Sequence, residues 1–392
     1  AQVDHGDAVH RALDGMSRER VVAPGFEAVA KVFDKYHSGD KHGASFAATM
    51  NGRQVVDLWG GLREDGSPWM DDTVCVIASG TKGICAVAVL MCAERGHVDL
   101  DARIDSLWPE FATGGKGHVT IGDSLAHVTG VPGIERPISF EEIIDPVLMA
   151  RYVAEQVPFV KVGSPTYHAL TYGWIASEII RRVDGRSIGT FVREEIAGPL
   201  GLDLHIGAPE SVISRISKTV RSSDYNYTSL IGDDIDPRLA FVYGLIPTEK
   251  AGTPEMSRAE LPGGGGVASA HAMSRLYAML VNGGELDGVR LLRPETIELA
   301  RKERSFGADE LSGREIRFGV GFELNPNPSR LGMSPDAFGH TGAGGSTHGA
   351  WPSLRTSFSY AMGEFQPEPR DSRGIELLDV LDECVVKSSR SN

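Results

Sequence analysis

The chain has 392 residues, 41% of them hydrophobic and 23% charged, a composition that supports a large folded core and excludes a disordered chain. Its 53 acidic and 39 basic residues give a formal net charge of −14, which argues against nucleic acid or an anionic membrane surface as a partner. The longest strongly apolar run, residues 84–93, is far shorter than the roughly 20 residues of a membrane span.

The first elements predicted along the chain are a helix and a hairpin. Apolar residues at helical spacing predict an amphipathic helix over residues 25–37. The dipeptide Asn51-Gly52 joins apolar runs at 44–50 and 54–59, which predicts a β-hairpin. Because a lone hairpin is marginal in water, this one is expected to join a larger sheet.

Helices predominate in the middle of the chain, and strands return near its end. Residues 83–95 are apolar on almost every side, which predicts a helix in the centre of a core, and residues 171–183 predict another. Segments 319–324 and 356–362 read as strands. The apolar face expected of a last helix consists of Ile375, Leu378, Leu381 and Val385.

This distribution of elements predicts an α+β fold. An antiparallel sheet flanked by helices would be built from both ends of the chain, residues 1–75 and 265–392. A helical domain, residues 76–264, would be inserted between them. The sequence does not predict an oligomeric state.

The cysteines and the first residues of the chain bear on its location. Cys75, Cys85, Cys92 and Cys384 form no C-x-x-C pair, and we interpret them as small buried thiols in a reducing compartment. Residues 1–7 have neither the basic nor the apolar segment of a signal peptide. We therefore expect a cytoplasmic protein.

Several common motifs are missing from the sequence. It contains no H-E-x-x-H, no paired C-x-x-C and no G-x-x-x-x-G-K-[ST], and we predict neither a metal nor a cofactor. The nucleophile elbow G-x-S-x-G is also absent. Residues 122–125 spell the Gly-Asp-Ser-Leu signature of another esterase class, but no Asp-x-x-His follows near the C-terminus, which disfavours that class. The glycines at 263–266 are interpreted as a flexible loop.

The most informative pair of residues is Ser79 and Lys82, at the start of the all-apolar helix. Residues i and i+3 are neighbours on a helix, about 5–6 Å apart at Cβ, so an amine would lie beside a hydroxyl. Burial of this helix would desolvate Lys82 and lower its pKa. The helix start also offers N–H groups to an oxyanion. Ser79 is therefore a candidate nucleophile. The alternative is a serine that caps the helix and a solvated lysine.

The segment Ser79-Gly80-Thr81-Lys82 resembles the S-x-x-K box of the serine β-lactamase and penicillin-binding-protein superfamily. Three further segments resemble other boxes of that superfamily, in the same order: 127–132, 163–174 and 340–345. Over residues 25–385 the chain most resembles the family VIII carboxylesterases, which share the fold of class C β-lactamases. The resemblance implies an active site in the cleft between the sheet-containing domain and the helical domain.

The resemblance also implies a role for each site residue. Tyr167 would be the general base for Ser79, with a pKa lowered by Lys82, and would later protonate the leaving alcohol. The backbone N–H groups of Ser79 and Ala343 would form the oxyanion hole. Tyr172 is the alternative base, although its place in a helix favours packing.

The third box implies residues that contact the substrate, His340 and Gly342. His340 stands where class C β-lactamases have lysine, and is expected to be neutral and able to donate a hydrogen bond. Ala169 stands where they have an asparagine that binds the substrate amide. Trp351 is expected to add an aromatic wall to the pocket.

Both departures from the class C pattern weaken recognition of a β-lactam more than that of a neutral ester. We predict a carboxylesterase that cleaves small-molecule esters with short to medium acyl groups through an acyl-enzyme on Ser79. A β-lactamase or D-Ala-D-Ala carboxypeptidase of the same fold is the alternative. A non-catalytic binding protein that kept the fold is a third hypothesis.

Overall fold

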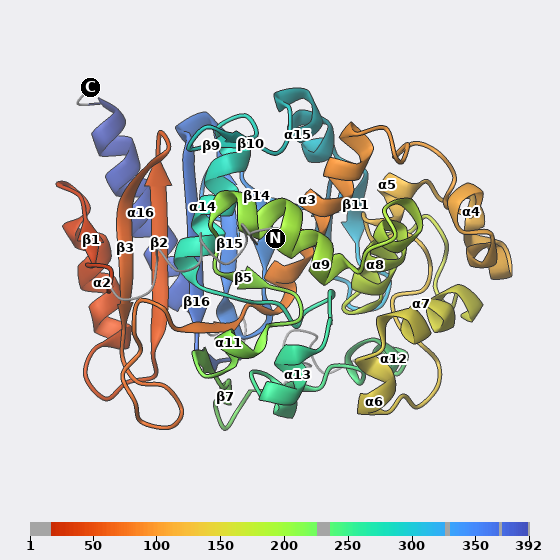
Figure 1. Ribbon diagram of the computed structural model, residues 1–392, viewed down its shortest axis with the longest axis horizontal. Coiled ribbons are helices and arrows are strands. Elements are labelled where there is room, and N and C mark those ends of the chain that lie inside the picture. Colours follow the sequence, from red (N-terminus) through yellow and green to blue (C-terminus); the bar gives the residue numbers. More distant parts are fainter. Residues whose placement is uncertain (1–16, 226–235, 326–329, 368–370, 391–392) are drawn as a thin grey trace, which may run out of the picture.

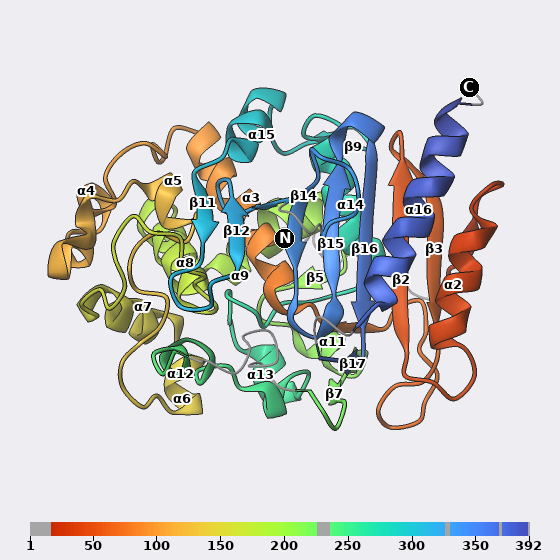
Figure 2. The ribbon, with the colours of Figure 1, turned by 180° about the vertical axis from the view of Figure 1, so that it is seen from behind.

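The computed structural model describes residues 17–225, 236–325, 330–367 and 371–390. Within these ranges the largest element is a nine-stranded antiparallel sheet, which Figures 1 and 2 show from opposite sides. Its strands, in order across the sheet, are β1 (Val21–Val22), β3 (Arg53–Gly60), β2 (Ala44–Met50), β16 (Thr356–Met362), β15 (Thr347–Trp351), β14 (Phe338–Thr341), β13 (Glu323–Leu324), β12 (Glu315–Phe318) and β11 (Ser305–Ala308). Strands from both ends of the chain meet where β2 pairs with β16. The antiparallel sheet predicted from the sequence is therefore confirmed.

Helices cover both faces of this sheet (Figures 1 and 2). The helices α2 (Glu27–His37) and α16 (Arg373–Arg390) lie together on one face, and α14 (Ala270–Val281) packs on the other face against β2, β15 and β16. On the apolar stripe of α2, Val29 and Phe33 are fully buried, as its amphipathic pattern predicts, and Ala30 is partly buried.

The predicted hairpin consists of β2 and β3, joined by Asn51 and Gly52. Both turn residues have left-handed backbone angles, with φ of 52° and 75°. A two-residue turn of type I′ requires this combination, and asparagine and glycine adopt it most readily.

The chain between β4 (Val74–Val76) and β8 (Val267–Ala268) is mainly helical. Its α-helices in the described ranges are α3 (Thr81–Glu94), α4 (Ile104–Leu107), α5 (Ile121–Ser124), α6 (Phe140–Ile143), α7 (Pro146–Glu155), α8 (Thr171–Val183), α9 (Ile188–Val192), α10 (Gly198–Leu200), α11 (Glu210–Ile213), α12 (Leu239–Tyr243) and α13 (Pro254–Arg258). As predicted, α3 is a core helix, buried from Thr81 to Cys92.

Short strands that the sequence does not predict also occur in this segment. β5 (Leu204–His205) and β6 (Ile216–Ser217) join β4 and β8 in a small sheet. The remaining elements are β7 (Val220–Arg221), paired with β17 (Glu364–Phe365), β9 (Glu285–Leu286), paired with β10 (Val289–Arg290), and α15 (Pro294–Arg301). The predicted domain boundaries near residues 75 and 265 stay a prediction.

Two sequence-based expectations about the fold are wrong. Segment 319–324 is not one strand, because β12 ends before Gly319 and a turn with Gly321 at φ 75° leads into β13. A left-handed residue cannot continue an extended strand. In α16, Ile375 is 48% exposed, whereas Leu378, Leu381 and Val385 are buried as expected.

All four cysteines are buried and carry free thiols. Residues 1–7, which the sequence analysis compares with a signal peptide, lie outside the described residues. Among the helices that the structure describes, none is both long and apolar enough to cross a bilayer.

Candidate active site

Ser79 lies in a tight turn between β4 and the central helix α3. The turn is a short 3₁₀ helix, η1 (Ala78–Gly80), and Ala78 has the left-handed φ of 45°, which is uncommon for a residue with a side chain. Two hydrogen bonds hold the turn: Thr81 Oγ1 donates to the Ala78 carbonyl at 2.7 Å, and the Gly266 N–H donates to Thr81 Oγ1 at 2.9 Å. No side chain caps α3 at its N-cap residue, Gly80. The interpretation of Ser79 as a cap is therefore wrong.

Lys82 is completely buried, one helical turn after Ser79. Its Nζ donates to Ser79 Oγ at 2.9 Å, to the Ala169 carbonyl at 2.7 Å and to the Gly263 carbonyl at 2.6 Å. All three acceptors are uncharged, so they offset little of the cost of removing an ammonium group from water. Burial consequently lowers the pKa of Lys82 to about 7, and the alternative of a solvated lysine is excluded.

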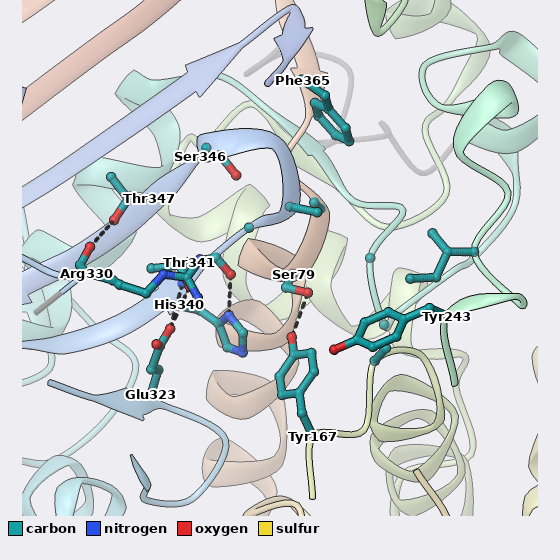
Figure 3. A pocket seen from close by; sticks show the side chains of 18 of the residues that line it. Ser79, Tyr167, Tyr243, Glu323, Arg330, His340, Thr341, Ser346, Thr347 and Phe365 are labelled. Atoms are coloured by element: carbon teal, nitrogen blue, oxygen red, sulfur yellow. Dashed lines mark hydrogen bonds between the residues drawn. The ribbon is translucent and has the colours of Figure 1, made fainter. Parts of the chain in front are cut away.

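Tyr167 also contacts Ser79, and Figure 3 shows its phenol directed at the serine hydroxyl. Its Oη donates to Ser79 Oγ at 2.7 Å, so the serine oxygen accepts hydrogen bonds from both the phenol and the amine. Lys82 Nζ lies 5.0 Å from the centroid of the Tyr167 ring. Burial raises the pKa of Tyr167, although its hydrogen bond with Ser79 opposes the shift. The pKa of Tyr167 is therefore raised and not lowered as the resemblance implies, because desolvation of the phenolate dominates.

The segment that carries Tyr167 is held from two directions. The Tyr167 N–H donates to Asp309 Oδ2 at 2.6 Å. The next N–H, of His168, donates to His127 Nδ1 at 3.0 Å, and Thr129 Oγ1 lies 2.6 Å from His168 Nε2. Residues 127–132, singled out by their resemblance, thus support the Tyr167 segment. Asp309 was missed, since no motif surrounds it in the sequence.

Tyr172, the alternative base, lies in the protein core and contacts the backbone of α3. Its Oη donates to the backbone carbonyl of Lys82 at 3.0 Å, and the side chain is fully buried within α8. It contacts neither the Ser79 hydroxyl nor the Lys82 amine by a hydrogen bond. The interpretation of Tyr172 as a packing residue fits this position.

The segment after β14 brings glycine backbone against the serine turn. A Cβ atom on Gly342 would lie 2.7 Å from the Ile77 carbonyl oxygen, closer than real Cβ atoms come, so only glycine fits. The next residue, Ala343, begins the short helix η6 (Ala343–Gly345). Within the described residues, the backbone N–H groups of Ser79 and Ala343 donate to no other group, and both residues line one cavity. Two N–H groups are thus available to an oxyanion, as the resemblance implies.

His340 lies on β14 beside the cavity, and its side chain is buried. Its Nδ1 lies 2.7 Å from the Thr341 carbonyl, which can only accept, so Nδ1 carries the proton. Burial, together with the charge of Lys82, lowers the pKa of His340 to about 4. A neutral ring protonated on Nδ1 leaves Nε2 as an acceptor, without a partner among the described residues. His340 is neutral as expected and donates a hydrogen bond within the site, to the Thr341 carbonyl, so that Nε2 could contact a substrate only as an acceptor. Its contact with substrate stays a prediction.

The cavity in front of Ser79 has a volume of about 600 Å³ (Figure 3). Most of the side chains around it are apolar, including Leu170, Ile246, Met256, Leu261, Phe318, Phe365 and Ile375. Ile375 is exposed on α16 because it faces this cavity. Trp351 does not line the cavity. It is fully buried, and its Nε1 donates to the Leu331 carbonyl at 2.6 Å. The expectation that Trp351 forms an aromatic wall of the pocket is therefore wrong.

Two more groups of the site were missed by sequence reasoning. Glu323 is buried, and its Oε2 accepts from the Thr341 N–H at 3.0 Å and from Thr341 Oγ1 at 2.9 Å. Gly263 supplies a carbonyl to Lys82, although its glycine run was interpreted only as a flexible loop. The glycine run itself was a usable signal, since a Cβ on Gly263 would lie 2.7 Å from the Leu170 carbonyl oxygen.

Comparisons with known proteins agree with this arrangement. The model of the beta-lactamase family matches residues 26–382. The esterase/beta-lactamase LipL of Mycobacterium tuberculosis (strain ATCC 25618 / H37Rv) is 31% identical over 376 residues, which cover 90% of this chain and 86% of that protein.

Solved structures resemble this chain over almost its whole length. A family VIII carboxylesterase superposes with a TM-score of 0.85 and 32% identity, covering 93% of this chain and 99% of that chain. A penicillin-binding-protein homologue from Caulobacter crescentus has a TM-score of 0.85 and 34% identity, covering 93% and 98%. The predicted β-lactamase-like fold is therefore confirmed. The chain belongs to the beta-lactamase family and is similar, within it, to the family VIII carboxylesterases.

Proposed function

We propose that this chain is a serine carboxylesterase that hydrolyses small-molecule esters through an acyl-enzyme on Ser79. One observation carries the proposal: Ser79 Oγ accepts hydrogen bonds from a buried amine and a buried phenol at the wall of a largely apolar cavity. The esterase names of a relative and of a solved structure similar to this chain support it.

In the proposed acylation step, Lys82 takes the proton of Ser79. With a pKa of about 7, a large share of this amine is neutral at neutral pH and can accept a proton. Ser79 Oγ attacks the ester carbonyl carbon, and the N–H groups of Ser79 and Ala343 stabilise the negative charge on the carbonyl oxygen. The resemblance assigns the base role to Tyr167, but its raised pKa favours a neutral phenol.

Tyr167 is the proposed acid for the leaving group. Its phenol lies 2.7 Å from Ser79 Oγ, the atom that becomes bonded to the acyl carbon. As the bond from that carbon to the alkoxide oxygen breaks, Tyr167 transfers its proton to the alkoxide oxygen. The proton held by Lys82 then passes to Tyr167, which restores both groups. In deacylation a water replaces the alcohol and gives a proton to Lys82 while its oxygen attacks the acyl carbon. The bond from that carbon to Ser79 Oγ then breaks, Tyr167 gives its proton to Oγ, and the proton on Lys82 passes to Tyr167.

The residues that replace the class C pattern favour a neutral substrate. His340 is neutral, with a pKa lowered by burial to about 4, and Ala169 has no amide to bind a β-lactam. Arg330 also lines the cavity, but its charge acts on the buried Glu323 carboxylate and lowers the pKa of that group against the effect of burial. The cavity of about 600 Å³ suits an ester of short or medium acyl chain.

The proposed function is tested by Ser79→Ala. We expect hydrolysis of a short aryl ester to fall to the uncatalysed rate, because among the described hydroxyl groups that line the cavity it is Ser79 that contacts both Lys82 and Tyr167. An organophosphate should label the wild-type chain on the peptide containing Ser79, located by mass spectrometry. A variant that keeps most of its turnover would refute the nucleophile assignment. Faster turnover of a chromogenic cephalosporin than of the aryl ester would favour a β-lactamase.

We also propose that the chain divides into residues 1–75 with 265–392 and residues 76–264, with the substrate bound between them. The lining of the cavity supports this division, since Tyr167 and Tyr243 come from one part and His340 and Phe365 from the other. Limited proteolysis should cut near the two boundaries before it cuts within either part.

A cytoplasmic location is the last element of the proposal. Four buried cysteines with free thiols support it, because such thiols persist in a reducing compartment. Fractionation of the source cells, with the chain detected in the membrane or exported fraction, would refute it.

A further inference from the structure

A buried ion pair lies behind the turn that presents the Ala343 N–H. Arg373, the first residue of α16, binds Asp371 with two parallel hydrogen bonds, Nε to Oδ1 at 2.9 Å and Nη2 to Oδ2 at 2.8 Å. Only 5% of the arginine side chain and 1% of the aspartate side chain are exposed. Burying two charges is costly unless their geometry and remaining hydrogen bonds compensate, and Arg373 also contacts Glu364, with Nη2 donating to its carbonyl at 2.9 Å and Nη1 lying 3.5 Å from its Oε2.

The pair contacts the turn directly. Arg373 Nη2 donates to the Gly344 carbonyl at 3.3 Å, and the Gln366 N–H donates to the same oxygen at 3.2 Å. Asp371 fills the space beside Gly345, where a Cβ atom would overlap its carboxylate. The turn is therefore packed against the start of α16, where Asp371 also lines the cavity.

The turn is closed by a hydrogen bond from the Gly342 N–H to the Ser346 carbonyl at 2.8 Å, but two of the residues between them are glycine. Gly344 and Gly345 have φ of 81° and 110°, conformations open to glycine, whose backbone is also the most flexible. An oxyanion donor must lie within about 2.7–3.1 Å of the developing charge. A small rotation of this turn would move the Ala343 N–H out of that range.

We propose that Arg373 and Asp371 are positioning residues that hold the Ala343 N–H in place for ester hydrolysis. This inference rests on the proposed function, since it assumes that the N–H stabilises an oxyanion. Neither side chain takes part in the chemistry, and each acts through the Gly344–Gly345 backbone. Their loss should therefore weaken binding of the tetrahedral state more than binding of the ester.

The test compares Arg373→Lys and Asp371→Asn with the wild-type chain. Lysine keeps the charge but lacks the planar fork, and asparagine keeps the shape but loses the charge. Loss of an oxyanion donor lowers kcat by about 10²–10³-fold, so a displaced donor should lower it on the order of tenfold, with KM changed by no more than about twofold.

The affinity of the two variants for an alkylboronic acid should fall by a similar factor. Ser79 Oγ bonds to boron, its proton passes to Lys82, and a boron-bound oxygen occupies the hole.

The matched control is Arg186→Lys. Arg186 binds Asp184 with the same fork and the same two-residue spacing, Nε to Oδ1 at 2.6 Å and Nη2 to Oδ2 at 2.9 Å, away from the cavity. This variant should keep the wild-type kcat and boronate affinity. Thermal unfolding of all variants identifies losses that come from stability alone.

Unchanged kcat and boronate affinity in folded Arg373→Lys and Asp371→Asn would overturn the positioning role. Equal losses in the control would overturn it as well, because the effect would then be one of general stability. Boronate binding, measured by calorimetry, needs no turnover. A wild-type chain that binds boronate but hydrolyses no ester would count against the proposed function alone.

Discussion

The hydroxyl of Ser79 lies between two groups whose pKa values move in opposite directions for one reason. Burial disfavours the charged form of each, so it lowers the pKa of the Lys82 amine and raises that of the Tyr167 phenol. At neutral pH this pair offers a group that can accept a proton and a group that can donate one. Such separation of pKa values is what assigns base and acid roles in hydrolases.

The first prediction at this scale concerns pH. If neutral Lys82 is the base, kcat/KM for an aryl ester should rise with pH and level off, with a midpoint near 7, because protonation below that pH removes the acceptor. Lys82→Arg should lose this rise and nearly all activity, since a guanidinium stays protonated. The profile is measured between about pH 5 and 9. A rise that continued toward pH 10 would return the base role to Tyr167.

The second prediction separates the roles of Tyr167 by leaving group. In Tyr167→Phe the alkoxide departs without its proton donor, so an alkyl ester should lose more kcat than an aryl ester with an acidic phenol as leaving group. We expect the difference between the two losses to be on the order of tenfold or more. Equal losses for both esters would contradict the assignment. Circular dichroism of the variant checks that the fold is retained.

At the scale of elements, the site depends on how closely β14 and η6 approach the serine turn. Gly342 faces the Ile77 carbonyl with no room for a side chain. A Cβ atom added to Gly342 would also lie 3.3 Å from the Cβ atom of Ala78. The distance between the two N–H donors is therefore set by a contact between backbones. A change here alters the oxyanion hole without touching a catalytic side chain.

The prediction that follows is made for Gly342→Ala. The added methyl group must push the end of β14 away from the serine turn, so kcat should fall by about tenfold or more, by the same reasoning on oxyanion donors. Labelling of Ser79 by an organophosphate should slow in parallel, because that reaction also places an oxygen in the hole. A fully active, folded variant would show that the two backbones are not in the contact described.

At the scale of the whole molecule, the sequence predicted those features that depend only on residues close together in the chain. The hairpin at Asn51 and the Ser79–Lys82 pair each follow from one short segment and one backbone periodicity. Contacts between distant segments had no such signal. Asp309 holds Tyr167 across 142 positions, and the Gly263 carbonyl binds Lys82 across 181.

The errors have the same origin. Trp351 and Ile375 were both identified as large apolar residues, but which of them faces the cavity is decided by the packing of β15 and α16. The pKa of Tyr167 depends on how much water reaches it, and neighbouring sequence letters do not specify that quantity. The boxes named in the sequence analysis contribute Ser79, Tyr167 and His340 to one cavity, whereas the resemblance alone gave Tyr167 a charge state that its burial opposes.

The pairing of β2 with β16 has a consequence for how the protein is made. The paired residues Met50 and Thr356 are 306 positions apart in the sequence. The ribosome must therefore add about 300 more residues after 44–50 before it has made residues 356–362. Until then one edge of the nascent hairpin has unpaired backbone groups that invite association with other chains. Chaperones that bind extended apolar segments should therefore occupy this hairpin during synthesis and leave it when the last strands emerge.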